Sequence, residues 1–167
     1  MAIAIVAATA VFGVGVWYSQ TYAWYVELTD ETVFMTRYDG VTEPLPVAAF
    51  EGIDAETSPL RYRACFTTDL SLPTLSETYQ AYAPAVPLNA PGWFSCFQAE
   101  QIGAAVEAGE ALAFLGQQNR PYGFDIVVAI DAAGQGYAWP QINPCGEASF
   151  GGDPLPPGCP VAPERTE

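Results

Sequence analysis

Residues 124–130 (FDIVVAI) and 136–142 (GYAWPQI) decide the fold, because a turn of small and polar residues, 131–135 (DAAGQ), separates them. Both segments are short, apolar and rich in β-branched or aromatic residues, which is typical of paired strands. We therefore predict a β-hairpin over residues 124–142. Pro140 has no amide hydrogen to donate, so it should place the second strand at a sheet edge or end its pairing.

Other strands are predicted around this hairpin from short alternating runs bounded by turn residues. The candidates are residues 25–28, 32–38, 60–67 and 111–115. In the third run, Tyr62 and Phe66 fall on one face, and Arg63 and Cys65 fall on the other. Between residues 40 and 59, Pro44 and Pro46 argue against a central strand.

The best helix candidate covers residues 98–109, where Ile102 and Val106 share a face and Gly109 is a suitable C-terminal stop. Residues 68–92 are interrupted by prolines and predict an irregular loop that packs on the domain or covers something. The sum is an α+β domain: a small, mainly antiparallel sheet with one main helix. The tail, residues 143–167, is rich in proline and glycine and shows no periodicity.

Residues 2–18 read AIAIVAATAVFGVGVWY and contain no charged side chain. A hydrocarbon core about 30 Å thick is crossed by roughly 20 mostly apolar helical residues, and residues 2–23 have this length. Aromatic side chains follow where such a helix would leave the lipid. These belt residues are Trp17, Tyr18, Tyr22, Trp24 and Tyr25. We therefore predict a transmembrane anchor over residues 1–24, a periplasmic domain over 25–142 and a disulfide-clasped tail over 143–167.

A cleaved signal peptide and a buried globular helix are the alternatives to this anchor. A signal peptide normally has a basic start and a small-residue cleavage site, whereas no Lys or Arg precedes Arg37 and the exit is aromatic. The same lack of basic residues leaves the orientation open under the positive-inside rule. Small residues at helical spacing would allow close packing against another membrane helix. They are Ala4, Ala8, Thr9, Gly13 and Gly15.

The chain has four cysteines, Cys65, Cys96, Cys145 and Cys159, and no histidine. Histidine-containing zinc patterns are therefore impossible, and an all-cysteine site would lack its characteristic paired spacing. Two disulfides in an oxidising compartment are the simpler interpretation, and reduced thiols in a cytoplasmic domain are the alternative. Of the three connectivities we favour Cys65–Cys96 and Cys145–Cys159, because the second bond would order the Gly/Pro-rich tail. This interpretation places the N-terminus inside and the domain in the periplasm.

The composition argues against an enzyme. Without histidine the commonest general base, the commonest metal ligand and the Ser-His-Asp arrangement are all missing. The sequence also lacks the nucleotide-binding, nucleophile-elbow and covalent haem motifs. We expect no cofactor and no metal. Asp30, Glu31 and Asp153 give only a weak calcium signal, because no EF-hand spacing is present.

The formal net charge is −14, from 19 acidic and 5 basic residues. This balance argues against nucleic acid and against anionic lipid headgroups as partners, because both call for basic patches. It suits a basic soluble partner, such as a cationic electron-carrier cytochrome, or it simply keeps the domain soluble. Aromatic residues of the domain are expected in the core, with an exposed partner-binding patch as the alternative. They are Trp93, Phe94, Phe97, Tyr122, Tyr137 and Trp139.

Three segments, RYRACF (61–66), APGWFSCF (90–97) and YGFDIVVAIDAAGQGYAWPQINPCGE (122–147), carry a family resemblance. Behind an N-terminal apolar helix, they resemble an uncharacterised, domain-of-unknown-function family of small membrane-anchored proteins from Rhodobacterales-type alphaproteobacteria. The resemblance implies a bacterial inner-membrane protein with a periplasmic domain. It supplies no catalytic residues. The chain departs from the expected pattern at its start, where a basic residue normally precedes the span.

From these observations we expect a non-enzymatic, single-span accessory subunit or assembly factor of a larger inner-membrane complex, photosynthetic or respiratory. Its partners would be the lipid bilayer and the other subunits of that complex. One alternative is a periplasmic domain that binds or senses a small ligand or cation. A second is a carboxylate-dependent hydrolase of envelope material, which needs two acidic groups with raised pKa values in one concave site.

Overall fold

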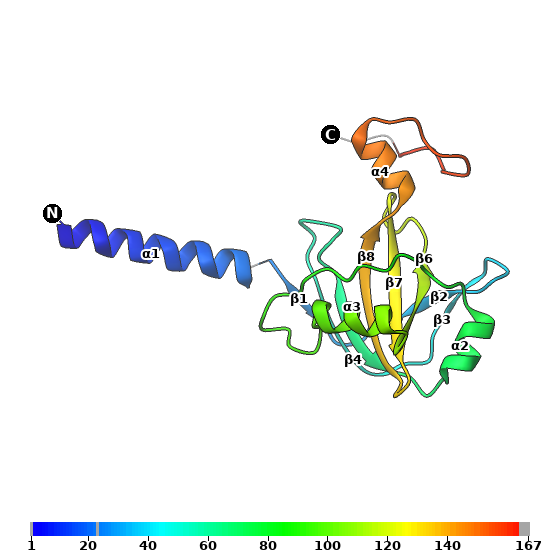
Figure 1. The fold of residues 1–167 in the computed structure, drawn as a ribbon. Helices are drawn as coiled ribbons and strands as arrows, with labels where there is room; N and C mark the ends of the chain where they lie inside the picture. Colours follow the sequence, from blue (N-terminus) through cyan, green and yellow to red (C-terminus); the bar gives the residue numbers. More distant parts are fainter. Residues whose placement is uncertain (1, 23, 164–167) are drawn as a thin grey trace.

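A computed structural model describes residues 2–22 and 24–163 of the chain. The elements in chain order are α1 (Ala2–Thr21), β1 (Val26–Leu28), β2 (Phe34–Thr36), β3 (Thr42–Pro44), β4 (Ala48–Asp54), β5 (Arg63–Thr67), α2 (Leu72–Thr78), α3 (Ala99–Ala108), β6 (Ala111–Gln117), β7 (Phe124–Asp131), β8 (Gln135–Ile142) and α4 (Pro144–Gly151). Helix α1 projects from a body that contains all the other elements (Figure 1). The fold is therefore α+β with a lone N-terminal helix.

The body is built on a six-stranded sheet with strand order β1-β4-β5-β8-β7-β6, in which every neighbouring pair is antiparallel. A second, two-stranded sheet pairs β2 with β3. The predicted hairpin is the pair β7 and β8, with Val127 opposite Trp139 and Val128 opposite Ala138. The predicted α+β class with a mainly antiparallel sheet is confirmed.

Strand β7 is buried on both faces, which explains its unbroken apolar sequence. Val127 and Ala129 join one core cluster with Trp139, while Val128 and Ile130 join the other. All five side chains are 0% exposed. A strand covered on both sides reads as a continuous apolar run rather than as an alternation, and the sheet needs material on each face.

Different layers cover the two faces. The face with Val128 and Ile130 packs against residues of β2 and of α2, including Met35 and Leu75. The face with Val127 and Trp139 packs against Ile102 of α3 and the loop that precedes it. Helix α3 lies in front of the sheet in Figure 1, and α2 lies at its side. Most of the aromatic residues assigned to the core lie in or against it: Phe94, Phe97 and Trp139 are buried, and Trp93 and Tyr137 pack against them.

The turn between β7 and β8 is held by one side chain. The Asp131 carboxylate accepts hydrogen bonds from the backbone amides of Ala133 (2.8 Å) and Gln135 (2.9 Å). Gly134 has φ +81°, and a Cβ placed on it would lie 2.3 Å from the Thr68 carbonyl oxygen. Glycine is needed here for its positive φ and for the close approach of a second chain segment.

Pro140 ends one pairing of β8 and leaves the other intact. It lies opposite Ile126 of β7, whereas the pairing with β5 ends at Ala138. The strand is central rather than at an edge, so only the second half of the prediction for Pro140 is correct. The missing amide of a proline removes a hydrogen bond to only one neighbouring strand, and β5 no longer pairs with β8 at this position.

Several elements differ from the sequence prediction. Prolines 44 and 46 do not prevent a central strand, because β4 begins after both and lies between β1 and β5. The stretch 68–92 contains α2, which Ser71 caps by accepting from the Thr74 amide. The tail begins with α4, capped by Asn143. Helix α3 agrees closely with prediction, and Gly109 ends it at φ +73°.

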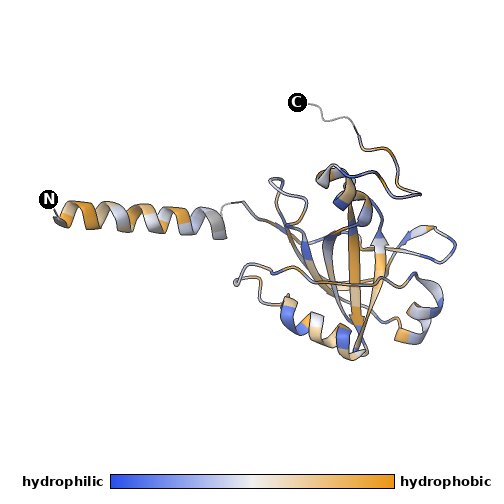
Figure 2. Cartoon of the chain, turned by 45° about the horizontal axis from the view of Figure 1, so that its top comes forward, coloured by the Kyte–Doolittle hydropathy of each residue, from blue (hydrophilic) through white to orange (hydrophobic). Residues whose placement is uncertain are grey.

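Helix α1 is apolar along most of its described length (Figure 2). Within the part of the chain that the structure describes, no helix combines the length and the apolarity that crossing a membrane requires.

Candidate functional site

The end of α1 is attached to the body through Trp93. The indole Nε1 of Trp93 donates a 2.8 Å hydrogen bond to the carbonyl oxygen of Thr21. Its ring stacks on Tyr22 and meets Tyr25 edge-on, each with ring centroids 5.8 Å apart. Tyr18 stacks on the Tyr22 ring at 5.8 Å. Trp17 meets the Tyr22 ring with centroids 5.6 Å apart. We call these five residues the helix-end aromatic cluster: Trp17, Tyr18, Tyr22, Tyr25 and Trp93.

Four of the five residues predicted for the interfacial belt lie in this cluster, and Trp93, which was not predicted for the belt, lies with them. Trp17, Tyr18, Tyr22 and Tyr25 belong to the cluster, whereas Trp24 is 53% exposed and forms no ring pair with another described residue. The added member, Trp93, lies more than sixty residues away in sequence. The sequence predicts Trp93 in the core or in an exposed patch, because no local pattern links it to α1.

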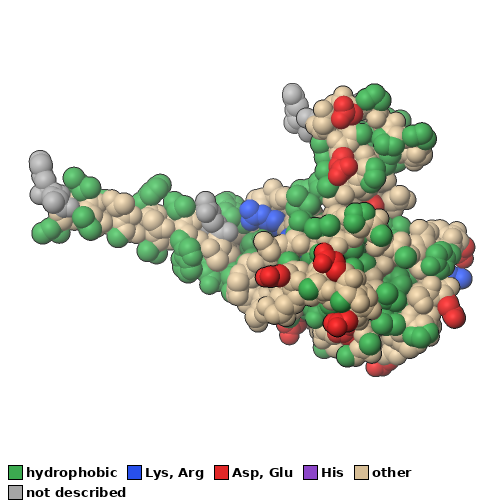
Figure 3. Space-filling model, in the orientation of Figure 1, with side chains coloured by type: hydrophobic (Ala, Val, Ile, Leu, Met, Phe, Trp, Pro, Cys, Tyr) green, Lys and Arg blue, Asp and Glu red, His purple; other side chains and the backbone are tan. Residues whose placement is uncertain are grey.

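Arg61 closes the cluster on the side of the body. Its guanidinium lies 5.3 Å from the centroid of the Tyr25 ring, a cation–π geometry. Its Nη1 is buried and has no hydrogen-bond partner among the residues described. In Figure 3, basic side-chain atoms lie next to the end of α1, whereas acidic ones are spread over the body.

The predicted helix-packing residues contact nothing in the body. Ala4, Ala8, Thr9 and Gly13 are exposed, as is Gly15. A Cβ added to either glycine would meet no heavy atom within 4 Å. The Thr9 hydroxyl donates to the Ile5 carbonyl oxygen at 2.7 Å, so its polar group is satisfied within the helix. The surface of α1 is therefore free for an occupant outside this chain.

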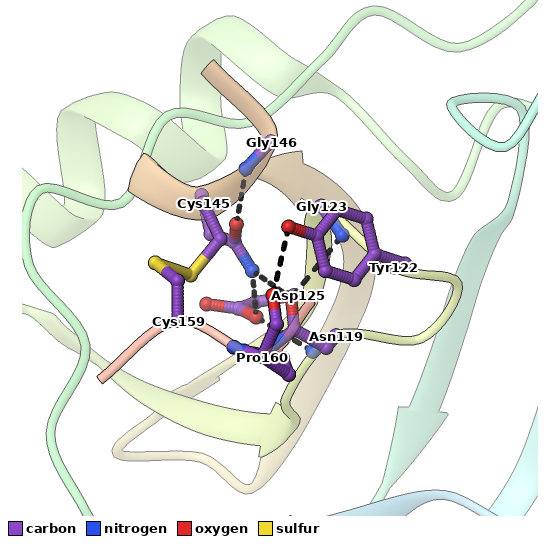
Figure 4. The surroundings of a disulfide bond; sticks show 9 residues. Asn119, Tyr122, Gly123, Asp125, Cys145, Gly146, Cys159 and Pro160 are labelled. Atoms are coloured by element: carbon purple, nitrogen blue, oxygen red, sulfur yellow. Dashed lines mark hydrogen bonds between the residues drawn. A yellow bond between two sulfur atoms is a disulfide. The ribbon is translucent and has the colours of Figure 1, made fainter. Parts of the chain in front are cut away.

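The four cysteines form the two disulfides Cys65–Cys96 and Cys145–Cys159, the pairing favoured from the sequence. The first joins β5 to the loop that carries Trp93. The second joins α4 to the tail (Figure 4). Tyr122 adds a further link, because its hydroxyl donates to the Pro160 carbonyl oxygen at 3.1 Å.

A buried polar network lies beside the second disulfide. The Asp125 carboxylate is 5% exposed and accepts from the Asn119 amide (2.9 Å), the Asn143 side-chain amide (2.7 Å) and the Tyr82 hydroxyl (3.2 Å). Burial and the Asp125 charge raise the pKa of Tyr82. Because these donors converge on one carboxylate, the network holds the start of α4 against the sheet and is structural.

A cavity of about 610 Å³ lies on the sheet face that β2 covers. Its floor is apolar and includes Phe34, Ile126 and Ala138. Its polar lining comes from three separate segments: Glu31 before β2, residues 54–62 from the end of β4 onward, and residues 117–120 from the end of β6 into the β6–β7 loop. A volume of several hundred Å³ with an apolar floor and a few polar groups is typical of small-molecule sites.

Negative charge prevails in this cavity. Glu31, Asp54 and Glu56 line it together with one cation, Arg120. Desolvation, followed by the nearby Asp54 charge, raises the pKa of Glu31. Burial, together with the charges of Glu31 and Asp54, raises the pKa of Tyr62. Both pKa shifts arise mainly from burial, with a smaller contribution from the neighbouring carboxylates.

Sequence reasoning identified only part of this cavity. It named Glu31 as a weak calcium ligand beside Asp30 and Asp153, but the cavity is lined by Glu31 and Asp54 and not by the other two. Among the residues described, no group of three or more metal-binding side chains is arranged to hold a metal ion. The hydrolase alternative requires two carboxyl groups with raised pKa values, and Glu31 supplies one.

Comparison with known proteins places this chain in a family. A family model described as a family of unknown function, DUF6446, matches residues 33–160, from just before β2 to just after the second disulfide. The match leaves α1 and β1 outside. Neither the curated proteins nor the solved structures gave a match. Since the family model covers most of the chain, this protein belongs to the DUF6446 family, whose function is unknown.

Proposed function

We propose that this protein is a membrane-tethered, non-enzymatic accessory subunit or assembly factor of a larger bacterial inner-membrane complex. In this proposal α1 inserts in the bilayer, the helix-end aromatic cluster lies at the lipid–water interface, and the acidic body lies in the periplasm. Photosynthetic and respiratory complexes are the candidate hosts.

The exposure of α1 carries the proposal. Ile3 is 87% exposed, Val11 74% and Phe12 73%. An uncharged helix that is apolar all round is stable only where an apolar environment covers it. No helix among the described residues qualifies as a membrane span, so the proposal depends on the exposed apolar side chains of α1. Lipid, with a neighbouring membrane helix against the small residues, supplies such an environment.

The aromatic cluster supports a position at the interface. Tyrosine and tryptophan rings favour the headgroup level, where one edge is apolar and the other is wet. Trp93 brings the body to the same level as Tyr22, since their rings stack. The body would then stay close to the membrane surface and would not move freely on a linker.

The disulfides support a periplasmic position for the body, and the net charge supports a basic partner. Two disulfides indicate an oxidising, extracytoplasmic compartment. The net charge of −14 suits a basic partner, for which a soluble cationic cytochrome is our candidate. Charge of this sign raises the association rate with a basic protein, and high salt reduces this enhancement by screening the charges.

Two experiments test the proposal on the full chain in native membranes. In the first, alkaline carbonate extraction should leave the protein in the membrane pellet. Val11→Arg should move it to the soluble fraction, because a central charge costs about 3 kcal/mol on insertion. Thr9→Ser is the matched control on the same helix and should behave as the wild type. Release of the wild type by carbonate would contradict the tether.

In the second experiment, the tagged protein is purified from native membranes in a mild maltoside detergent and its companions are identified by mass spectrometry. A fixed set of inner-membrane subunits at constant stoichiometry is the expected result. A protein that elutes as a solitary monomer at every detergent concentration tested would overturn the accessory role, even if the tether holds.

A further inference from the structure

We propose that Arg61 binds the phosphate group of a zwitterionic phospholipid beside the end of α1. The guanidinium would donate to the phosphate oxygens, and the lipid would lie next to the helix-end aromatic cluster. This site rests on the proposed membrane tether and goes beyond it, because it names the lipid group that the body itself contacts.

Arg61 has a buried donor that no described residue satisfies. Its Nη1 atom is buried and makes no hydrogen bond. Neither of the ion pairs between described residues involves Arg61, because Arg37 makes both of them. A buried cationic N–H group without an acceptor is costly, and native proteins normally give such a group a partner. Arg61 therefore needs an acceptor from outside the described part of the chain.

Arg63, two residues further on, shows how a structural arginine is satisfied in the same region. Its guanidinium donates to four backbone carbonyl groups, among them those of Leu60 (2.8 Å) and Leu88 (2.9 Å). Arg63 is buried, whereas Arg61 is only half-buried. Arg61 thus combines partial exposure with a missing acceptor, which is the combination expected of an arginine that binds a ligand.

The position of Arg61 points to the membrane as the source of the acceptor. Its guanidinium carbon lies 5.3 Å from the centroid of the Tyr25 ring, and Tyr25 meets Trp93 edge-on. Basic side-chain atoms are visible at the surface beside the end of α1 (Figure 3). In the proposed tether these rings lie at the headgroup level. Arg61 would then lie at the depth of the lipid phosphates.

The chemistry of the site favours a lipid phosphate over a free anion. A guanidinium carries its donors in a planar fork that matches the oxygens of a phosphate. The net charge of −14 disfavours the approach of a free phosphate ion. Phosphatidylcholine and phosphatidylethanolamine carry no net charge, and the bilayer holds their phosphates beside the helix end. The acidic balance that argues against anionic headgroups therefore leaves a zwitterionic lipid as the suitable ligand.

The test uses the full chain, labelled with carbon-13 at the arginine guanidinium carbons and reconstituted in phosphatidylcholine vesicles. Flotation on a sucrose gradient first measures whether the chain is bound to the vesicles. Carbon–phosphorus dipolar recoupling in solid-state NMR then detects a guanidinium carbon that lies beside a lipid phosphate. The chain has five arginines and no lysine, so few signals compete. We expect phosphorus to attenuate an arginine signal of the wild type.

Variants assign the attenuated signal to its residue. Arg61→Gln should abolish the attenuation. Arg37→Gln removes the same charge and is the matched control, because β2 and β3, which flank Arg37, lie on the side of the body away from α1 (Figure 1). This control should keep the attenuated signal. Attenuation that persists in Arg61→Gln would locate the contact at another arginine and overturn the assignment.

Two further outcomes separate the lipid from other sources and the site from the tether. In frozen maltoside micelles with an excess of inorganic phosphate, the wild type should show no attenuation. Equal attenuation there would indicate a general phosphate site and overturn the lipid assignment. Protein that floats with the vesicles but shows no attenuated signal would contradict the Arg61 site alone. Protein that does not float would contradict the tether, and the lipid site with it.

Discussion

The indole nitrogen of Trp93 donates a 2.8 Å hydrogen bond to the carbonyl oxygen of Thr21, the last residue of α1. The last carbonyl groups of a helix have no partner inside it, so the body satisfies one of them. The Cys65–Cys96 bond holds the loop that bears Trp93. Trp93, on a loop that a disulfide holds to the sheet, thus adds a side-chain contact to the chain connection between α1 and β1.

Trp93→Phe should therefore loosen the attachment of α1 without unfolding the body. The substitution keeps a ring for stacking but removes the donor, at a cost of about 1 kcal/mol. Hydrogen exchange of residues 21–28 should become faster, while exchange in β7 and β8 stays unchanged. Trp24→Phe is the matched control, because Trp24 is exposed and outside the cluster. Equal exchange in both variants would contradict the connection.

Arg63→Met should destabilise the body strongly. Arg63 is 4% exposed, and its guanidinium donates to four backbone carbonyl groups. Removing it leaves buried acceptors unpaired, for which we expect a loss of about 3 kcal/mol or more in the free energy of unfolding. Urea denaturation measures the change, and the exposed Arg120→Met is the control. A loss below 1 kcal/mol would show that water replaces the guanidinium.

Asp125→Ala should also destabilise, and its effect should spread to α4. Three donors lose their shared acceptor, and the buried Asn143 amide keeps only its bond to Asn119. We expect about 2–3 kcal/mol by chemical denaturation. Asp153→Ala, at an exposed carboxylate after α4, should change stability by less than about 0.5 kcal/mol. Similar values for the two variants would contradict a network role for Asp125.

The two disulfides should contribute to different parts of the fold. In the chain-entropy picture, closures with separations of 14 and 31 residues stabilise by about 3 and just under 4 kcal/mol. Replacing Cys65 and Cys96 by serine should lower the stability of the whole body. Replacing Cys145 and Cys159 should instead speed hydrogen exchange in α4 and the tail and leave β7 protected. Uniform loss of protection in the second variant would contradict this division.

The pH dependence of stability should contain a contribution from Glu31. Its pKa is raised above 4.5 in the fold, so between 4.5 and that raised pKa the folded state binds more protons than the unfolded state. The contribution is fully present below about pH 4.5 and is lost as the pH rises through the folded pKa. The free energy of unfolding of Glu31→Gln should therefore differ most from that of the wild type near neutral pH, where the variant is the more stable of the two. Parallel stability–pH curves would contradict the shift.

Part of the secondary structure was predictable because it depends on residue patterns within short segments. The β7–β8 hairpin follows from two apolar runs around a turn, and α3 follows from its apolar face and Gly109. Strand β4 was not predicted because Pro44 and Pro46 disfavour a strand around them, whereas the strand starts only after Pro46. Helices α2 and α4 were missed because proline near a helix start is compatible with helix, where the lost amide has no partner anyway.

The amino-acid sequence by itself determined the central β7–β8 hairpin, helix α3, the favoured cysteine pairing, the acidic balance and an apolar first helix. These properties depend on composition and on neighbours within a few residues. Only the tertiary structure decided that Trp93 meets Thr21, that Asp125 gathers three donors, and that Glu31, Asp54 and Tyr62 line one cavity. Such groupings arise when strand order and packing bring distant segments together, and no local pattern encodes that geometry.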